Sequence, residues 1–239
     1  MHVAALYDIH GNLPALEVVL AEIERKSPDV ILVGGDVSAG PFPSETLEVL
    51  RELGERARFI RGNADRYLAA GGRKLGLADA WCAEQLTVEQ RRFLDGLPET
   101  ITLDVDDLSP TLFCHGSPRS DEEMITLATT EARLLPMLEE VEERVVVCGH
   151  THMQFDRTLS GVRIVNAGSV GMPYGTPGAF WALLGPGVEL RRTEYDLEPA
   201  AGRIRTSAWP LAEEFAAENV LTVPSEQEAT EFFERMAVG

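Results

Sequence analysis

Short apolar runs alternate with amphipathic stretches over the first sixty residues. Residues 2–7, Val30–Val33 and Ala57–Ile60 are apolar runs of strand length. Between the first two, Leu13–Lys26 places its apolar side chains on one face, which is typical of a helix, and Ser44 has the character of a cap for a second helix. A strand–helix–strand–helix–strand order predicts a parallel, doubly wound sheet.

The rest of the chain lacks this regular alternation of strands and helices. A helical insertion is expected over about 65–97, with a glycine break at Gly71-Gly72. Strands are expected at Thr100–Val105, Thr111–Cys114 and Val145–Cys148, and a helix over Glu131–Val141. Four strand runs joined by short turns at Ser160-Gly161 and Pro186-Gly187 predict hairpins: Gln154–Leu159, Val162–Val165, Ala179–Leu184 and Val188–Tyr195. Residues from about 199 to 239 form a helical segment. We therefore expect one α/β domain over 1–239, with a parallel first half and an antiparallel second half.

Composition limits the function classes. The chain has 239 residues, of which 44% are hydrophobic and 25% charged, an ordinary globular balance. Its start lacks the basic segment of a signal peptide, and no apolar run approaches the roughly 20 residues of a membrane helix, so we expect a soluble, cytoplasmic protein without a membrane partner. A net charge of -18 argues against surface binding of nucleic acid, but a phosphate substrate is still compatible with it if bound cations invert the charge locally.

Five of the apolar runs end in a side chain that can bind a metal. These side chains are Asp8, Asp36, Asn63, His115 and His150, with His10 and His152 two residues beyond the first and the last. Ligands of open α/β sheets bind beyond the carboxyl ends of the strands. Side chains two apart in an extended segment point the same way, so Asp8 and His10 should share one metal neighbourhood, as should His150 and His152. Flanking glycines at 11, 35, 62, 116 and 149 permit sharp turns and close backbone approach.

The number of candidate ligands favours two metal ions. Four of the five histidines occupy these positions, and only His2 lies outside them. Seven ligands exceed what one ion of four- to six-fold coordination needs. A carboxylate can bridge two ions about 3.5–4 Å apart, and such a pair lowers the pKa of a shared water toward about 7 for in-line attack on phosphorus.

This set of motifs resembles the calcineurin-like metallophosphoesterases. That family carries Asp-x-His, Gly-Asp, Gly-Asn-His-Asp/Glu, a later His, and Gly-His-x-His. Here they stand, in family order, as Asp8-Ile9-His10-Gly11, Gly35-Asp36, Gly62-Asn63-Ala64-Asp65, His115-Gly116 and Gly149-His150-Thr151-His152. Asn166-Ala167-Gly168-Ser169 resembles a further family segment, and we expect Asn166 and Ser169 to support the histidine loop.

The resemblance implies a fold, a ligand set and a cofactor. The fold would be a four-layer α/β/β/α sandwich with two mixed β-sheets. The first metal would take Asp8, His10, Asp36 and His152, and the second would take Asp36, Asn63, His115 and His150, with Asp36 as the bridge. Catalytic roles are expected for Asp36, Asn63, Asp65 and His115. Family members commonly use manganese, iron, zinc, nickel or magnesium, and manganese is expected here.

One position departs from the family pattern. Where the third motif usually has a histidine that acts as general acid or stabilises the transition state, this chain has Ala64. A small bacterial and archaeal branch, often with cysteine there, also lacks the histidine and is associated with phosphodiester hydrolysis. The chain looks most similar to that branch. Because losing a general acid typically costs about 10²–10⁴-fold where a basic oxygen leaves, we expect phosphodiesters or activated aryl esters to be preferred over alkyl monoesters.

Residues around these motifs have two interpretations each. Asn12, Arg61 and Arg66 are candidate contacts for the substrate's phosphate, and Arg73 and Arg119 share the same chemistry. Alternatively, Asn12 shapes the turn and the arginines are solvated or paired with carboxylates. Asp65 either orients the site or caps the following helix.

Several functions remain beside the phosphodiesterase. One is a phosphomonoesterase, acting on proteins or nucleotides; another is a dinuclear amide or lactone hydrolase, although the His-x-His-x-Asp-His pattern of such sites is absent. A third is a catalytically silent metal-binding scaffold, in which lost ligands would be expected. The partner is a small phosphate ester, and its identity stays open. The C-terminal aromatics, Trp209, Phe215, Phe232 and Phe233, either pack on the second sheet or form the interface of a homo-oligomer.

Overall fold

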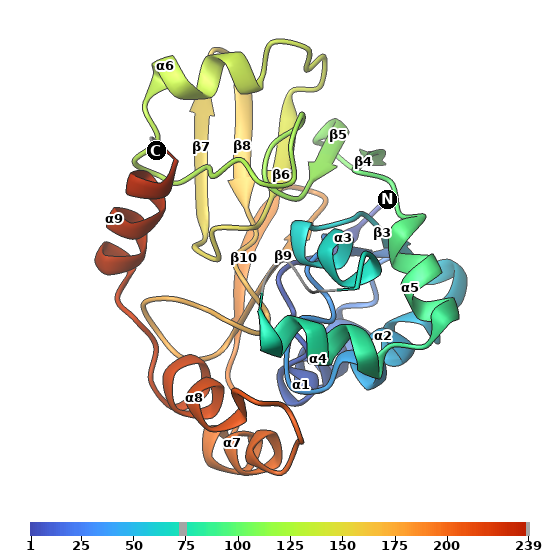
Figure 1. Ribbon diagram of the computed structural model, residues 1–239. Helices are drawn as coiled ribbons and strands as arrows, with labels where there is room; N and C mark the ends of the chain where they lie inside the picture. The colour runs from blue at the N-terminus through green and yellow to red at the C-terminus, as the bar shows by residue number, and fades with distance from the viewer. Residues whose placement is uncertain (72–75, 238–239) are drawn as a thin grey trace.

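Two sheets form the centre of the molecule in this computed structural model, which describes residues 1–71 and 76–237 (Figure 1). The first sheet has the order β10-β9-β1-β2-β3 and the second the order β4-β5-β6-β8-β7. The first contains β1 (Val3–Leu6), β2 (Val30–Val33), β3 (Ala57–Phe59), β9 (Ala179–Leu184) and β10 (Val188–Thr193). The second contains β4 (Thr100–Val105), β5 (Ser109–Cys114), β6 (Val145–Cys148), β7 (Phe155–Leu159) and β8 (Val162–Asn166).

Both sheets are mixed. In the first, β1, β2 and β3 run parallel, while β9 is antiparallel to both β1 and β10. In the second, β5, β6 and β8 run parallel, and the edge strands β4 and β7 are antiparallel to their neighbours. The expected hairpins β7–β8 and β9–β10 are confirmed. The expected antiparallel second half holds for these hairpins and for β9 beside β1, but it is wrong for β8, which the β7–β8 hairpin turns back to lie parallel to β6.

Alternating side chains of the central strands explain the layers. Ala4 and Leu6 of β1 pack against helices, whereas Val3 and Ala5 point between the two sheets. In the second sheet the inward residues of β6 meet this inner layer, and Val146 and Cys148 pack outward under α6. Strands that are buried on both faces have continuous apolar sequences, and β1, β2 and β6 are of this kind. The fold is the predicted α/β/β/α sandwich.

Helices cover the outer faces of the sheets (Figure 1). In chain order they are α1 (Leu13–Lys26), α2 (Pro43–Arg51), the 3₁₀ turn Gly54–Arg56, α3 (Asn63–Ala69), α4 (Leu77–Gln85), α5 (Val88–Asp95), α6 (Glu131–Leu134) and the 3₁₀ turn Leu135–Met137. The C-terminal segment contains α7 (Leu197–Arg205), α8 (Ala212–Phe215), the π-helical segment Ala216–Leu221 and α9 (Glu226–Met236). Among the described residues, no helix is both long and apolar enough to span a bilayer.

Proline changes two of the predicted helices. Ser44 does not cap α2: the helix begins at Pro43, whose fixed φ suits a first helical position, and Ser44 lies inside the first turn and bonds to Gln90. The helix predicted over Glu131–Val141 ends as α-helix at Leu134 and continues as a 3₁₀ turn, because Pro136 has no N–H to donate.

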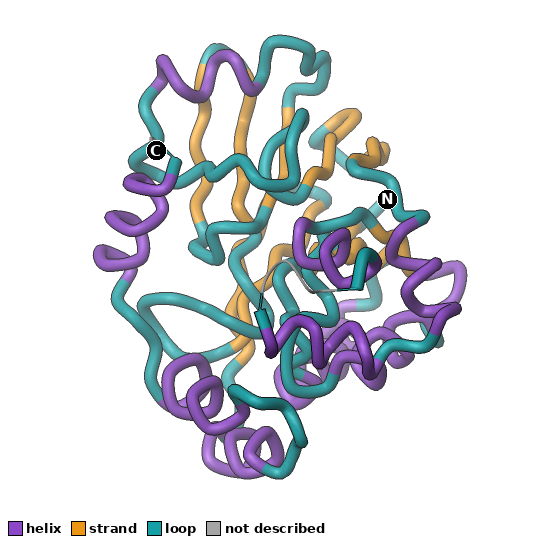
Figure 2. Tube along the Cα trace, in the orientation of Figure 1, coloured by secondary structure: helices purple, strands orange, loops and turns teal. Residues whose placement is uncertain are grey.

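The C-terminal helices pack on the molecule along one side. Figure 2 shows them running from α7 at the bottom of the view to α9 at its left. Helices α7 and α8 and the π-helical segment enclose a cluster with Met172 and Tyr195 at its edge. Helix α9 packs through Ala229 and Phe233 onto Met153 and Tyr174. In contrast, Phe232 is 48% exposed.

Candidate metal centre

Six predicted ligands meet in two groups at the strand ends. One group contains Asp8, His10 and His152, and the other contains Asp36, His115 and His150. Within each group the ligand atoms lie within 4.8 Å of one another. The seventh, Asn63 at the start of α3, adjoins the second group, because its Oδ1 lies 3.1 Å from Nε2 of His115. We call these groups the first and second cluster.

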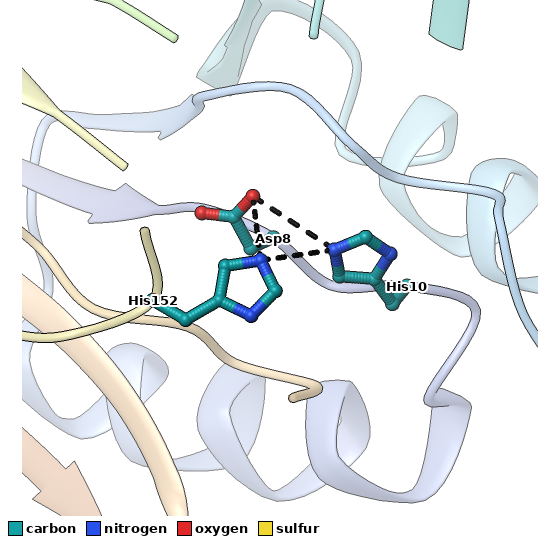
Figure 3. Close-up of side chains that lie close together, drawn as sticks. All are labelled: Asp8, His10 and His152. Carbon is teal, nitrogen blue, oxygen red and sulfur yellow. Dashed lines mark hydrogen bonds and ion pairs between the residues drawn. The ribbon is translucent and has the colours of Figure 1, made fainter. Parts of the chain in front are cut away.

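The side chains of the first cluster converge through the Nε2 atoms of its histidines (Figure 3). Nε2 of His152 lies 3.2 Å from Nε2 of His10 and 3.3 Å from Oδ1 of Asp8. The other ring nitrogens face backbone carbonyls: Nδ1 of His152 lies 2.8 Å from Met172 O, and Nδ1 of His10 lies 3.3 Å from Ala39 O. Donation from Nδ1 to a carbonyl leaves the Nε2 lone pair free for a cation, as in metal sites generally.

The second cluster is built in the same way. Nδ1 of His115 lies 2.9 Å from the carbonyl of Gly34, and its Nε2 lies 3.5 Å from Oδ2 of Asp36. Nε2 of His150 and Oδ1 of Asp8 are buried without a hydrogen-bond partner among the described residues. Buried polar atoms normally have a hydrogen-bond partner, so these two atoms without one are consistent with a bound cation. Carboxylate oxygen and imidazole nitrogen are donors that suit divalent first-row metals.

Each carboxylate is held by one oxygen and faces the histidines with the other. Oδ2 of Asp8 accepts the backbone N–H of His150 at 2.8 Å, and Oδ1 of Asp36 accepts that of Ala64 at 2.8 Å. Oδ2 of Asp36 lies 3.9 Å from Nε2 of His10, a residue of the other cluster. Asp36 therefore stands between the two clusters, where a bridging ligand would stand.

Five of the seven candidate ligands have a left-handed backbone conformation instead of an extended one. The φ angles of Asp8, His10, Asp36, His150 and His152 are 52°, 48°, 54°, 64° and 60°. Such conformations cost about 1–3 kcal/mol each outside glycine and persist only where the surroundings impose them. The expectation that His150 and His152 share one neighbourhood is wrong, because this geometry sends them to different clusters. Asp8 and His10 do share one.

Close backbone approach explains two of the flanking glycines. A Cβ at Gly62 would collide with Oδ1 of Asp36, and one at Gly149 would lie 2.5 Å from Oδ2 of Asp8. The carboxylates could not reach their backbone donors past such a methyl group. The glycine pattern in the motifs therefore belongs to the geometry of the carboxylates.

Opposite charges set the protonation of the metal-free centre. Burial opposes the charged form of His115, but the carboxylates of Asp36 and Asp8 outweigh it and raise its pKa to about 10. Burial likewise opposes ionisation of Asp36, yet His115 and His10 hold its pKa well below the usual range. Burial and the charge of His115 lower the pKa of His150 to about 4. The site thus offers ionised carboxylates and a neutral His150.

Asp65 is buried beneath the second cluster and bonds to the backbone. Its Oδ2 accepts the N–H groups of Asp36 and Gly62 at 2.8 and 3.0 Å, and its Oδ1 accepts that of Val37 at 3.0 Å. Burial and the nearby charge of Asp36 raise its pKa to about 7. Both carboxylate oxygens are therefore engaged in holding the loop that carries Asp36 and in capping the first turn of α3.

The predicted substrate contacts all have protein partners where the structure describes them. Buried Asn12 caps α1 by accepting Ala15 N–H at 3.2 Å and donates to Gly171 O at 3.0 Å. The guanidinium groups pair with carboxylates, Arg61 with Glu99, Arg66 with Asp121 and Glu122, and Arg119 with Glu123. Arg73 lies outside the described residues. These pairs favour the structural interpretation, and phosphate binding by the arginines stays a prediction.

Residues after the second histidine motif support the ligands. As expected, Asn166 donates to Gly149 O at 2.7 Å, and the Ser169 hydroxyl donates to Asp8 O at 2.7 Å. Sequence reasoning missed Tyr174, whose ring stacks on His152 with centroids 5.7 Å apart and planes 24° apart. Its only signal was an aromatic residue within the glycine- and proline-rich stretch 171–178.

Comparisons with known proteins establish the family. Residues 1–184 match the family model of the calcineurin-like phosphoesterase superfamily domain, and the chain belongs to that family. It is 25% identical to the phosphodiesterase YfcE of Escherichia coli over 186 residues, which are 74% of this chain and 83% of the relative. The chain is accordingly a phosphoric ester hydrolase, and its family implies divalent metals.

Solved structures agree with the fold. A metallophosphoesterase from Sphaerobacter thermophilus is 28% identical and superposes with a TM-score of 0.73, covering 92% of this chain and 99% of that one. A hypothetical protein from Pyrococcus horikoshii is 24% identical and superposes with a TM-score of 0.79, covering 90% of this chain and 96% of the other. The similarity therefore extends well past residue 184 in both cases.

Proposed function

We propose that the protein is a phosphodiesterase that works with two divalent metal ions, with manganese as the expected metal. The observation that carries this proposal is the pair of clusters with Asp36 between them. Oδ2 of Asp36 lies 3.5 Å from His115 of the second cluster and 3.9 Å from His10 of the first. Two ions held by these residues would supply charge neutralisation for the phosphoryl oxygens and activation of a water for in-line attack on phosphorus.

The protein's own groups hold this arrangement in place. Met172 and Ala39 carbonyls orient the rings of His152 and His10, and the Gly34 carbonyl orients that of His115. Asp65 fixes the backbone of Asp36. We assign Asp65 a positioning role, and Asp36, Asn63 and His115 roles as ligands at the reacting centre. Asn63 would supply an amide oxygen to the second metal.

A preference for phosphodiesters or activated aryl esters is supported by the position that lacks an acid. The Ala64 N–H donates to Asp36 Oδ1 at 2.8 Å, and its side chain is a methyl group that is 7% exposed. Position 64 therefore presents no side-chain proton to a leaving oxygen. Esters with good leaving groups tolerate this, whereas alkyl monoesters do not. The similarity to a named phosphodiesterase points the same way.

Metal analysis combined with a substrate panel tests the proposal. The purified full chain, loaded with Mn²⁺, is expected to hold about two ions and to cleave bis-p-nitrophenyl phosphate faster than glycerol phosphate. Asp36→Asn should lose both an ion and the hydrolysis. Equal turnover of glycerol phosphate and the aryl diester would favour the phosphomonoesterase, and two bound ions without hydrolysis of any ester would favour the silent scaffold.

A further inference from the structure

We propose that Tyr174 is a positioning residue for His152 and that the C-terminal helix α9 holds Tyr174 in place through Phe233. Helix α9 is thereby a structural part of the first cluster. The inference rests on the proposed function only in taking Asp8, His10 and His152 as a metal site.

Ring contacts lead from the first cluster to α9. Tyr174 stacks on His152, with ring planes 24° apart and centroids 5.7 Å apart. Phe233 of α9 meets Tyr174 edge to face, with centroids 6.0 Å apart and planes at 72°. His152 and Phe233 are buried, at 8% and 7% exposure. Each ring of this series therefore has its neighbour as a packing surface.

His152 needs a second constraint beside its hydrogen bond. The bond from Nδ1 to Met172 O, 2.8 Å long, fixes one atom of the ring but leaves the ring free to swing about that contact. Packing of Tyr174 against the ring face limits this swing and keeps Nε2 directed at Asp8, 3.3 Å away. Hydrogen-bonded partners that orient metal ligands typically contribute about 10–100-fold to metal binding, and we expect the ring contact to contribute at the lower end of this range.

The loop of Tyr174 is attached to the start of α9. The N–H of Gly175 donates to Pro224 O at 2.9 Å. A Cβ at Gly175, where φ is +79°, would lie 2.7 Å from Cγ of Glu226, so the loop and the helix are in close contact. Thr230 of α9 also donates to Sδ of Met153, the residue after His152, at 3.5 Å. The helix thus contacts both segments that flank the His152 ring.

The C-terminal end of α9 is fixed by the hydrogen bonds and the ion pair of Glu234. One carboxylate oxygen of Glu234 accepts the hydroxyls of Thr126 and Thr129 at 2.7 and 2.9 Å, and the other pairs with Arg133 at 2.5 Å. The same loop accepts the Thr151 hydroxyl at Ile125 O, 2.8 Å away. Helix α9 is therefore held at both ends and is not a loose terminus.

Loss of the contact between α9 and Tyr174 should affect metal binding by the first cluster only. Within the described residues, no hydrogen bond, ion pair or ring contact joins α9 to Asp36, His115 or His150. Helix α9 also lies beyond residues 1–184, the part that matches the family domain. The contact is thus supplied by a segment outside that domain, and its removal should weaken the first metal and spare the second.

Titration of the full-length protein with Mn²⁺ by calorimetry tests the proposal. Tyr174→Ala and Phe233→Ala should each weaken one of two binding events about tenfold and leave the other unchanged. Tyr174→Phe keeps the ring and should bind like the wild type. The matched control is Met236→Ala, an apolar residue of the same helix that is 53% exposed. Equal weakening of both events, no change, or an effect of Tyr174→Phe equal to that of Tyr174→Ala would overturn the proposal.

A second measurement needs no metal. The ring-current shift that Tyr174 imposes on the His152 ring protons should be present in the wild type and in Tyr174→Phe, and absent from Tyr174→Ala, with His152→Gln assigning the signals. An unchanged His152 spectrum in Tyr174→Ala would sink the inference. This outcome is separate from the proposed function, since two ions bound without any hydrolysis would end the phosphodiesterase proposal while leaving the link from α9 to His152 supported.

Discussion

The carboxylate of Asp65 holds the backbone of Asp36. Its Oδ2 accepts the Asp36 N–H at 2.8 Å, in a site where Asp65 is fully buried. Asp36 has a left-handed backbone, with φ at 54°, a conformation that the loop alone would not favour. The hydrogen bond therefore compensates for local strain and places the residue that stands between the two clusters.

Asp65→Asn is expected to destabilise the protein and to weaken metal binding. The amide has one acceptor fewer and would direct an N–H at a backbone donor, and leaving a buried donor unpaired costs about 1–3 kcal/mol. Urea denaturation and Mn²⁺ titration measure the two effects. Asp95→Asn, at an exposed position on α5, is the control and should change neither. Full stability of Asp65→Asn with intact metal binding would contradict the positioning role.

Metal binding should release a proton from His115. Its pKa, about 10 in the metal-free protein, means that the ring is protonated at pH 8, whereas a ligand must be neutral. Metal affinity should therefore increase with pH up to about 10, since the proton competes with the ion. His150, with a pKa of about 4, is already neutral and contributes no proton. Calorimetry in two buffers of different ionisation enthalpy counts the protons released, and a count of zero at pH 8 would refute this assignment.

The candidate ligands could be predicted because their residue types stand at or just beyond the ends of apolar runs. Asp8 and Asp36 follow neighbouring parallel strands of the first sheet, which end at one edge, so their meeting follows from topology. His115 follows β5 of the second sheet and reaches them because the two sheets pack face to face. The sequence motif also shows the absence of an acid at Ala64. Such features depend on the local pattern of short apolar runs and on the residues that follow them.

The conformation of the ligands could not be predicted, because distant backbone imposes it. The His10 N–H donates to Asp36 O at 2.9 Å, and the Asp8 N–H to Gly35 O at 3.1 Å, so each ligand loop is shaped by another. Tyr174 and Phe233 are likewise 59 positions apart in the chain, and neither residue type marks a metal site. Contacts between distant polar and aromatic groups leave no periodic signal for sequence reasoning to find.

The contacts of Glu234 should make the free energy of unfolding depend on pH. Burial raises the pKa of this carboxyl, but hydrogen bonds from Thr126 and Thr129 and the charge of Arg133 outweigh burial and lower it below 4.5. A carboxyl group whose pKa is lower in the folded protein than in the unfolded chain stabilises the fold at pH values above the pKa of the unfolded chain. This stabilisation is lost as the pH falls through the pKa of the folded protein. Glu234→Gln should cost roughly 1–2 kcal/mol at pH 7 and less below pH 4.5.

Urea denaturation of both proteins across pH measures this difference. Glu231→Gln, an exposed carboxylate on the same helix, should behave like the wild type at every pH. A difference for Glu234→Gln that stays constant down to acid pH would show that the charge of Glu234 contributes nothing to holding α9.

Ala64→His should add the missing acid. Position 64 follows Asn63 at the start of α3, and its backbone N–H already contacts Asp36, so an imidazole there would stand beside the second cluster. A general acid contributes about 10²–10⁴-fold where a basic oxygen leaves, and a histidine introduced without a matched environment should recover at least ~10-fold on glycerol phosphate. Bis-p-nitrophenyl phosphate, whose leaving group needs no proton, should gain little.

The ratio of kcat/KM for the two esters is the measurement, and Ala70→His, at the exposed end of α3, is the control for added histidine. A rise of both substrates by the same factor would show that the new side chain does not act on the leaving group, and that the preference for diesters has another origin than the residue at 64.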